Sequence, residues 1–296
     1  EMAISVDPNF VIAYDNKGNA WQALANFYLA IDDYDKALEI DPSYAPSYNN
    51  RGNAYRGLHY YEEALKDYST AIQISPRNAS SYFNRGVTYG LMEEWEKAIV
   101  DYSLAIAQDP IYADAYYNRG GAHGNLANYD EAIKDLSTVL VLQPTRAEAL
   151  HSRSLAHINL GAIESAITDL TNAIQIDPNM TIAYGDRAAA YMRKKDYEKA
   201  VSDSSMAIGL DENYTSAYLN RGISLFHLSE YSGAIEDYDR VLLLESDRVD
   251  VYAHLARAYT MLGIEVKVQE NLQQLTDRDV DITELSNELN ELRQGS

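Results

Sequence analysis

Proline recurs at a fixed interval along most of the chain. Six of the seven prolines lie 34 residues apart: Pro8, Pro42, Pro76, Pro110, Pro144 and Pro178. A period of roughly 20 to 50 residues is the signature of tandem repeats, in which each unit buries its hydrophobic face only by stacking on its neighbours. The spacing therefore predicts an array of similar supersecondary units, and this constrains the fold before any single motif is considered.

Two stripes of small and aromatic residues within each unit predict a helical hairpin. In the second unit, the first stripe is Tyr48, Gly52 and Tyr55, and the second is Tyr61, Ala64, Tyr68 and Ala71. Spacings of three and four residues place side chains on one face of an α-helix. We therefore expect helices over residues 45–58 and 61–74, the second of which ends at Ser75-Pro76 because proline cannot continue a helix.

The repeated order of aromatic, glycine, tyrosine, alanine and proline resembles the tetratricopeptide repeat family. Eight units match it: 11–44, 45–78, 79–112, 113–146, 147–180, 181–214, 215–248 and a degenerate 249–282, in which Val268 and Leu275 replace the two alanines. The resemblance implies an all-α, right-handed superhelical solenoid of stacked helix-turn-helix repeats. Over residues 283–296, Leu285, Leu289 and Leu292 predict a capping helix. Residues 1–10 are interpreted as the remnant of a preceding repeat, so we expect a fragment of a longer protein.

A cation and an aspartate recur in seven of the eight units. The cations stand where the family pattern has leucine: Lys17, Arg51, Arg85, Arg119, Arg153, Arg187 and Arg221. The aspartates follow sixteen residues later: Asp33, Asp67, Asp101, Asp135, Asp169, Asp203 and Asp237. In the eighth unit both charges are lost together, to Leu255 and Asn271. We predict a semi-buried pair that bridges the two helices of each of the first seven hairpins.

The chain is acidic, with a net charge of −21, but the acids avoid the first helices. These helices hold five of the 45 acidic residues and eleven lysines and arginines. In the family that the chain resembles, first helices line the concave surface and second helices the outer one. We interpret the excess acid as a solvated outer face, and we expect no nucleic-acid partner. No apolar run is long enough for a membrane span. Cysteine is absent, and the compartment stays undetermined, with the cytoplasm slightly favoured.

One polar column faces away from the packed side of the first helices. It consists of Asn16, Asn50, Asn84, Asn118, Ser152, Asp186, Asn220 and His254. A carboxamide carries a donor and an acceptor, which match the N–H and C=O of an extended peptide backbone. The five asparagines resemble the asparagine ladder in the tetratricopeptide region of the O-linked N-acetylglucosamine transferase, and Ser152 and Asp186 depart from it. Family ancestry with local capping of turns is the alternative explanation.

Other residues of the same face complete the predicted peptide-binding groove. Asn19 and Asn53 add amides to it, and Phe83 and Tyr117 are predicted as exposed aromatic anchors. Gly90, Gly121 and Gly124 leave part of the wall bare.

No catalytic, cofactor-binding or metal-binding motif is present in the sequence. We therefore expect a non-catalytic scaffold without a cofactor or metal, which holds an extended segment of a partner protein in its concave groove. Two alternatives remain. One is a self-assembling module that forms a homo-oligomer through the array ends, and the other is the substrate-selecting arm of a larger enzyme such as a glycosyltransferase.

Overall fold

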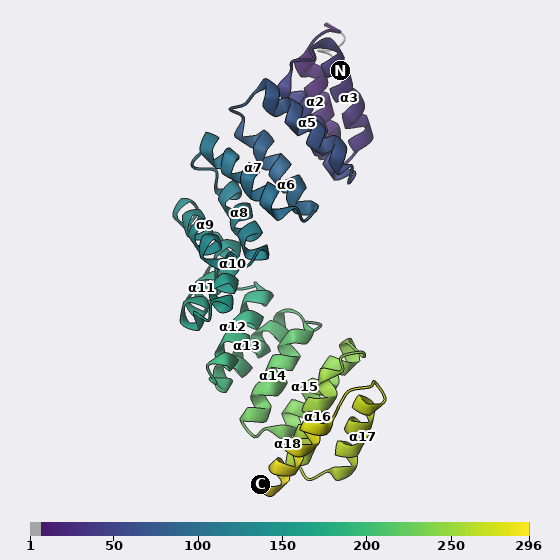
Figure 1. Cartoon of the computed structure of the whole chain (residues 1–296), viewed down its shortest axis with the longest axis vertical. Helices are drawn as coiled ribbons and strands as arrows, with labels where there is room; N and C mark the ends of the chain where they lie inside the picture. The colour runs from purple at the N-terminus through teal and green to yellow at the C-terminus, as the bar shows by residue number, and fades with distance from the viewer. Residues whose placement is uncertain (1–6, 296) are drawn as a thin grey trace. The chain divides into compact units, whose positions relative to one another are not determined.

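The protein is all-α over the part of the chain that the computed structural model describes, residues 7–295 (Figure 1). Seventeen helices and no strand lie in this range. The first helices of the eight hairpins are α2 (Val11–Ala23), α4 (Ala45–Gly57), α6 (Ala79–Leu91), α8 (Ala113–Asn125), α10 (Ala147–Asn159), α12 (Thr181–Arg193), α14 (Thr215–His227) and α16 (Asp250–Met261). The second helices are α3 (Phe27–Ile40), α5 (Tyr61–Ile74), α7 (Trp95–Gln108), α9 (Tyr129–Leu142), α11 (Ile163–Ile176), α13 (Tyr197–Leu210), α15 (Tyr231–Leu244) and α17 (Glu265–Thr276), and α18 (Thr283–Gly295) follows the last hairpin. The predicted hairpin architecture is therefore confirmed.

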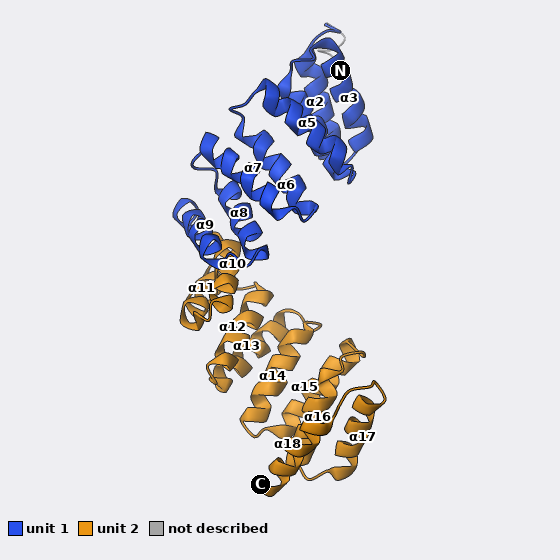
Figure 2. Ribbon diagram, viewed as in Figure 1, with its two compact units in different colours: residues 1–145 blue, residues 146–296 orange. Residues whose placement is uncertain are grey.

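The hairpins belong to two compact units, residues 1–145 and residues 146–296 (Figure 2). The first unit contains α2 to α9, and the second contains α10 to α18. Within each unit, the helices from α2 to α9 and from α10 to α17 each pack on the next one in chain order, and α18 packs on α16. Residues 1–6 of the predicted remnant lie outside the described range. Among the described helices, none has both the length and the apolar character needed to cross a membrane.

Close packing inside each hairpin depends on the small residues of the first helix. A Cβ atom placed on Gly52 would lie 2.7 Å from Cε1 of Tyr68, and Tyr68 is fully buried. Equivalent glycines meet Tyr34, Tyr102 and Tyr238 at similarly short distances. The absence of a side chain at Gly52 therefore lets the tyrosine ring occupy the space between the two helices.

The predicted ion pairs are present in all seven hairpins. In the third repeat, Nε and Nη2 of Arg85 each donate to one carboxylate oxygen of Asp101 at 2.7 Å. The side chain of Asp101 is 3% exposed and that of Arg85 is 20% exposed. The other five arginines repeat this two-bond geometry, and Lys17 makes a single bond of 2.8 Å to Asp33. The pair is semi-buried, as predicted.

The same guanidinium also reaches a third helix, which the sequence analysis did not anticipate. Nη1 of Arg85 donates to the hydroxyl of Ser69 at 3.1 Å, on the second helix of the preceding repeat. Arg119 contacts Ser103 in the same way, and Arg187 contacts Thr171. Each of these arginines therefore links its own hairpin to the one before it.

The last hairpin replaces this ionic link with apolar packing. Leu255 is 3% exposed, and Val268 and Leu275 are buried in the cluster that also holds Leu285 and Leu289 of α18. The leucine stripe of α18 therefore covers the core of the eighth repeat. Arg257 strengthens the contact through two bonds of 2.8 Å to Glu288 of α18.

A left-handed residue connects the two helices of every hairpin. These residues are Ala25, His59, Glu93, Ala127, Gly161, Lys195, Ser229 and Gly263, with φ between 57° and 74°. In the second repeat the N–H of Tyr60 donates to the carbonyl of Tyr55, and the N–H of His59 donates to that of Arg56. This is the Schellman arrangement, which satisfies the last carbonyls of a helix. Only two of the eight positions hold glycine, although glycine adopts this conformation at the lowest cost.

Replacing Arg85 with alanine should strongly destabilise the fold. The change leaves the buried carboxylate of Asp101 without its cation, which costs about 3–5 kcal/mol in the free energy of unfolding. Urea denaturation followed by circular dichroism measures this loss. Arg77→Ala is the control, because Arg77 is exposed in a turn and its loss should change stability by less than about 0.5 kcal/mol. Equal, small effects of both substitutions would contradict the semi-buried pairing.

Exchanging alanine and glycine at two equivalent turns should have opposite effects. Ala127 and Gly161 both adopt positive φ, at 57° and 74°. Ala127→Gly should stabilise the protein and Gly161→Ala should destabilise it, each by about 1 kcal/mol, because a left-handed Cβ is sterically unfavourable. Thermal melts of the two variants test this prediction. Shifts of the melting temperature in the same direction would show that the turn conformation does not control stability at these positions.

Candidate functional site

Successive first helices contact one another within each unit, and their shared surface is called the first-helix face below. In the first unit α2 contacts α4, α4 contacts α6, and α6 contacts α8. Asn16, Asn50, Asn84 and Asn118 return once per helix on this face. Asn16 is exposed and the other three are half-buried.

Two of these amides connect neighbouring first helices. Nδ2 of Asn50 donates to Oδ1 of Asp15 at 3.1 Å, and Nδ2 of Asn84 donates to Oδ1 of Asn49 at 3.1 Å. Asn118 instead donates to the carbonyl of Asp114 in its own helix, at 2.8 Å. A carboxamide has two N–H donors and an acceptor oxygen, so one such bond orients the group and leaves further hydrogen-bonding capacity.

A buried carboxylate organises the junction between the first two repeats. Asp15 is 5% exposed and accepts bonds from Ser47 at 2.7 Å and from Asn19 and Asn50 at 3.1 Å. The repeat pattern does not predict this cluster. Its signal is that Asp15 stands directly before the asparagine column, one repeat away from its partner Asn50.

Asn19 and Asn53 have a structural partner in the second helices. Oδ1 of Asn19 accepts from the hydroxyl of Tyr34 at 2.8 Å, and Oδ1 of Asn53 accepts from that of Tyr68 at 2.8 Å. Burial raises the pKa of Tyr68 to about 12, so its hydroxyl remains a proton donor at neutral pH. Both amide oxygens therefore accept from tyrosine hydroxyls of the second helices, and Gln22 is a further acceptor for Tyr34 at 3.3 Å.

The two predicted aromatic anchors are half-buried. The ring of Phe83 packs against Tyr112 with centroids 4.9 Å apart and against Tyr102 with centroids 5.9 Å apart. Tyr117 is half-buried on the next first helix. Phe83 thus presents only part of its ring to a partner, because the rest supports the junction between α6, α7 and α8.

The second unit keeps the links between first helices but changes their chemistry. Nε2 of His151 and Oδ2 of Asp186 lie 2.7 Å apart. Nδ2 of Asn220 donates to the carbonyl of Gly185 at 3.3 Å. Ser152 is half-buried in the same column. In this unit the column is therefore a mixed set of polar groups with one amide, rather than a row of amides.

A small apolar pocket lies on the first-helix face near the end of the second unit. Its volume is about 290 Å³, and its lining includes Ile223, Phe226, Tyr238, His254 and Arg257. The imidazole of His254 stacks on the ring of Tyr238, with centroids 5.3 Å apart. Burial lowers the pKa of His254, so the neutral ring is the favoured form.

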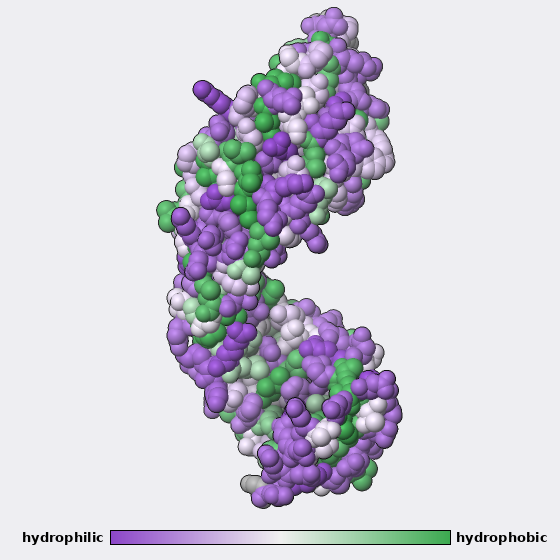
Figure 3. Space-filling view, viewed as in Figure 1, coloured by the Kyte–Doolittle hydropathy of each residue, from purple (hydrophilic) through white to green (hydrophobic). Residues whose placement is uncertain are grey.

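Residues 7–295 contain no group of three or more histidine, cysteine, aspartate or glutamate side chains arranged to hold a metal ion. Hydrophilic residues cover most of the face in Figure 3, with hydrophobic residues in smaller groups between them. The bonds described above make hydrogen bonding the main chemistry of the first-helix face, and the pocket beside Ile223 and Phe226 adds a small apolar recess.

The family models and the solved structures lead to the same type of repeat. Family models described as TPR repeat match residues 27–58, 60–93 and 91–126, and models described as tetratricopeptide repeat match residues 113–146 and 147–180. A search of curated proteins found no significant match.

Several solved structures share the fold. YrrB, described as a TPR protein with an unusual peptide-binding site, is 26% identical with a TM-score of 0.53, over 62% of this chain and 94% of that one. MamA is 24% identical with a TM-score of 0.52, over 57% and 92%. The C-terminal part of a TPR repeat-containing protein from Cytophaga hutchinsonii is 18% identical with a TM-score of 0.68, over 81% and 98%. The last two likenesses concern the fold alone.

Stability should fall in mild acid because of His254. In the unfolded chain histidine has a pKa of about 6.5, and the folded protein lowers it, so protonation favours unfolding. Arg257 and Arg248 oppose the charged form, whereas Asp250 and Glu288 favour it, and burial outweighs both. The stabilisation is therefore complete above about pH 6.5 and is lost as the pH decreases below this value.

Thermal melts between pH 8 and pH 5 measure this dependence. His254→Gln should show a smaller decrease of the melting temperature in acid than the wild type. His59→Asn, at an exposed turn position, should retain the wild-type decrease. An unchanged pH dependence in His254→Gln would show that this imidazole is not responsible.

Proposed function

Because this chain belongs to the tetratricopeptide repeat family, we propose that it is a non-catalytic scaffold that holds an extended segment of a partner protein on its first-helix face. The family models match repeats, not a catalytic domain. A role in protein interaction is supported by this membership. The peptide segment and its place on the face are the finer parts of the proposal.

The observation that carries the proposal is the oriented row of amides in the first unit. Asn50 is held by both carboxylate oxygens of Asp15 and Asn84 by one bond to Asn49, each on the preceding first helix, and Asn118 is held by one bond to its own helix. Their remaining N–H and C=O groups match the alternating polar groups of an extended backbone. Because the amides are already oriented, binding loses less side-chain entropy.

Open space beside the amides suits the side chains of such a segment. A Cβ atom placed on Gly121 or Gly124 of α8 would have no neighbouring atom within 4 Å. Backbone bonds to the asparagines would provide affinity without reading sequence, and the open space on α8 would accommodate varied side chains. YrrB, which shares the fold, is described as having an unusual peptide-binding site, in agreement with a peptide ligand for this kind of array.

The alternative of end-to-end self-assembly receives less support. It uses the leucine stripe of the last helix as a contact surface. In the structure Leu289 is 1% exposed and Leu285 is 9% exposed, since both pack on the eighth repeat. This stripe is therefore already occupied by its own chain.

The test is the triple variant Asn50→Ala/Asn84→Ala/Asn118→Ala. Each lost backbone bond removes about 1 kcal/mol, so three losses should weaken binding roughly 100-fold. Partners captured from cell lysate by the wild type and identified by mass spectrometry should be lost by this variant. Calorimetry with the captured segment then measures the loss of affinity.

A matched control alters second helices instead. Thr70→Ala/Thr138→Ala/Asn172→Ala removes three polar side chains from α5, α9 and α11 and should retain the partners. Both variants must have wild-type helicity, because Asn50 and Asn84 also link first helices. If the asparagine variant retained its partners at wild-type affinity, the binding site would lie elsewhere.

A further inference from the structure

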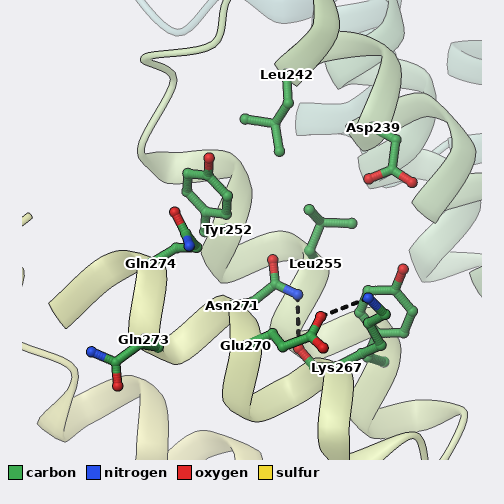
Figure 4. Close-up of a pocket in the computed structure, with 10 residues that line it drawn as sticks. Asp239, Leu242, Tyr252, Leu255, Lys267, Glu270, Asn271, Gln273 and Gln274 are labelled. Atoms are coloured by element: carbon green, nitrogen blue, oxygen red, sulfur yellow. Dashed lines mark hydrogen bonds and ion pairs between the residues drawn. The ribbon is translucent and has the colours of Figure 1, made fainter. Parts of the chain in front are cut away.

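A pocket of about 490 Å³ opens where α15, α16 and α17 meet (Figure 4). Asp239 of α15, Leu255 of α16 and Asn271 of α17 all line it. It is separate from the amides of the proposed peptide site, which lie on first helices of the other unit. No side chain of residues 7–294 fills this pocket. The internal repeats indicate which group would fit it.

The pocket occupies the place that an arginine takes in the earlier repeats. Leu255 stands at the arginine position, Asp239 lies sixteen residues before it and Asn271 sixteen residues after it. In the second repeat, Arg51 donates to Asp67, sixteen residues later, and to Asp35, sixteen residues earlier. The second repeat therefore already places a guanidinium between two acceptors. Asp239 occupies the position in its repeat that Asp35 occupies in the first repeat.

The loss of arginine leaves hydrogen-bond acceptors without donors. Asn271 is 7% exposed, and its Nδ2 donates to the carbonyl of Lys267 at 2.8 Å. Its Oδ1 has no donor among residues 7–295 and points into the pocket (Figure 4). Asp239 is exposed and makes no hydrogen bond or ion pair in the same range; partial desolvation raises the pKa of its carboxyl, and the charge of Lys267 opposes this shift. A ligand that satisfies both groups must be a donor, and Asp239 favours a cation.

Aromatic rings that flank the guanidinium elsewhere are also retained. Arg51 lies 5.5 Å from the ring centroid of Tyr48 and 5.9 Å from that of Tyr55. The corresponding rings in the eighth repeat, Tyr252 and Tyr259, both line the pocket. Rings at this spacing attract a cation, and a planar guanidinium also stacks on them.

Two cations of the chain lie nearby, and neither takes the arginine's place. The ammonium of Lys267 is 2.6 Å from the carboxylate of Glu270. Arg278 lies over Tyr252 at 4.9 Å. In the seventh repeat a single ring, Tyr218, has both Arg221 and Arg240 within 5.8 Å, so one guanidinium on a tyrosine leaves room for a second.

We propose that this pocket is a second binding site, which accepts the guanidinium of an arginine side chain from a partner protein. The pocket offers acceptors and rings for a side chain. Among the described residues that line the pocket, Lys267 is the one cation, and it is paired with Glu270, so the pocket does not present a group for the carboxylate of a free amino acid. The occupant is therefore an arginine within a polypeptide. The site would add a preference for arginine in the partner's sequence, because the amides of the proposed peptide site bind only the partner's backbone.

The probe is Nα-acetyl-arginine amide, added to the whole chain and compared with Nα-acetyl-lysine amide at equal ionic strength. Nuclear magnetic resonance of the Leu255 methyl groups and the Asn271 side-chain amide reports on occupancy. We expect saturable shifts with the arginine probe and a dissociation constant on the order of millimolar, as for a single charge-assisted contact. The lysine probe should give much weaker shifts because it lacks the planar fork.

Substitutions within the pocket provide the controls. Leu255→Arg restores a guanidinium from within the chain and should abolish the shift of the Asn271 amide by the probe. Asp239→Asn should weaken binding at least about tenfold, whereas Glu236→Gln, on the same helix but outside the pocket lining, should not. Arg221→Ala opens the equivalent place in the seventh repeat and should create a second site for the same probe.

Three results would overturn the proposal. They are the absence of saturable shifts, equal binding of both probes, and probe binding that persists in Leu255→Arg. Tighter binding of free arginine than of the blocked probe would overturn the assignment to a protein side chain.

Discussion

The arginine placed between three helices is the interaction on which the arrangement of this protein depends. In Arg85, Nε and Nη2 of the guanidinium donate to Asp101 of the same hairpin. The remaining nitrogen, Nη1, donates to Ser69 of the hairpin before it. A semi-buried ion pair adds little net stability, because desolvation offsets the attraction. Its geometric demand is strict, however, since both partners are costly to leave unpaired. The pair therefore sets the register of the helices more than it adds to their free energy.

This register brings the same positions of successive first helices together. The amide of Asn50 reaches Asp15, and the amide of Asn84 reaches Asn49, across the same interval of 35 residues. The proposed peptide site is a consequence of that repetition. A row of equivalent groups at equal spacing matches the regular spacing of polar groups in an extended backbone.

The eighth repeat shows what happens when the ionic link is removed. Leu255 packs in the core, and Val268 and Leu275 with α18 complete an apolar end. Terminal units of repeat arrays need such a cover, because no further repeat buries their core. Asp239 of the preceding repeat nevertheless remains as an acceptor beside the place that an arginine at position 255 would occupy. The proposed guanidinium site therefore exists because Leu255 and Asn271 replace the arginine and its aspartate while Asp239 remains.

The 34-residue period determined the hairpins, the small residues opposite the tyrosines and the seven ion pairs, because each recurs in the sequence at a constant interval. The left-handed turn residues carry no such signal, since glycine holds only two of the eight positions and the helix geometry imposes the conformation on the others. The partners of the amides also depended on tertiary structure. The packing angle between helices determines that Asn53 bonds to Tyr68 and that Asn84 bonds to Asn49. The sequence pattern does not contain that angle. The sequence alone thus determined the repeats, their hairpins and their ion pairs, whereas the tertiary structure decided which hydrogen bonds the amides make within the chain, because those bonds join residues of different helices.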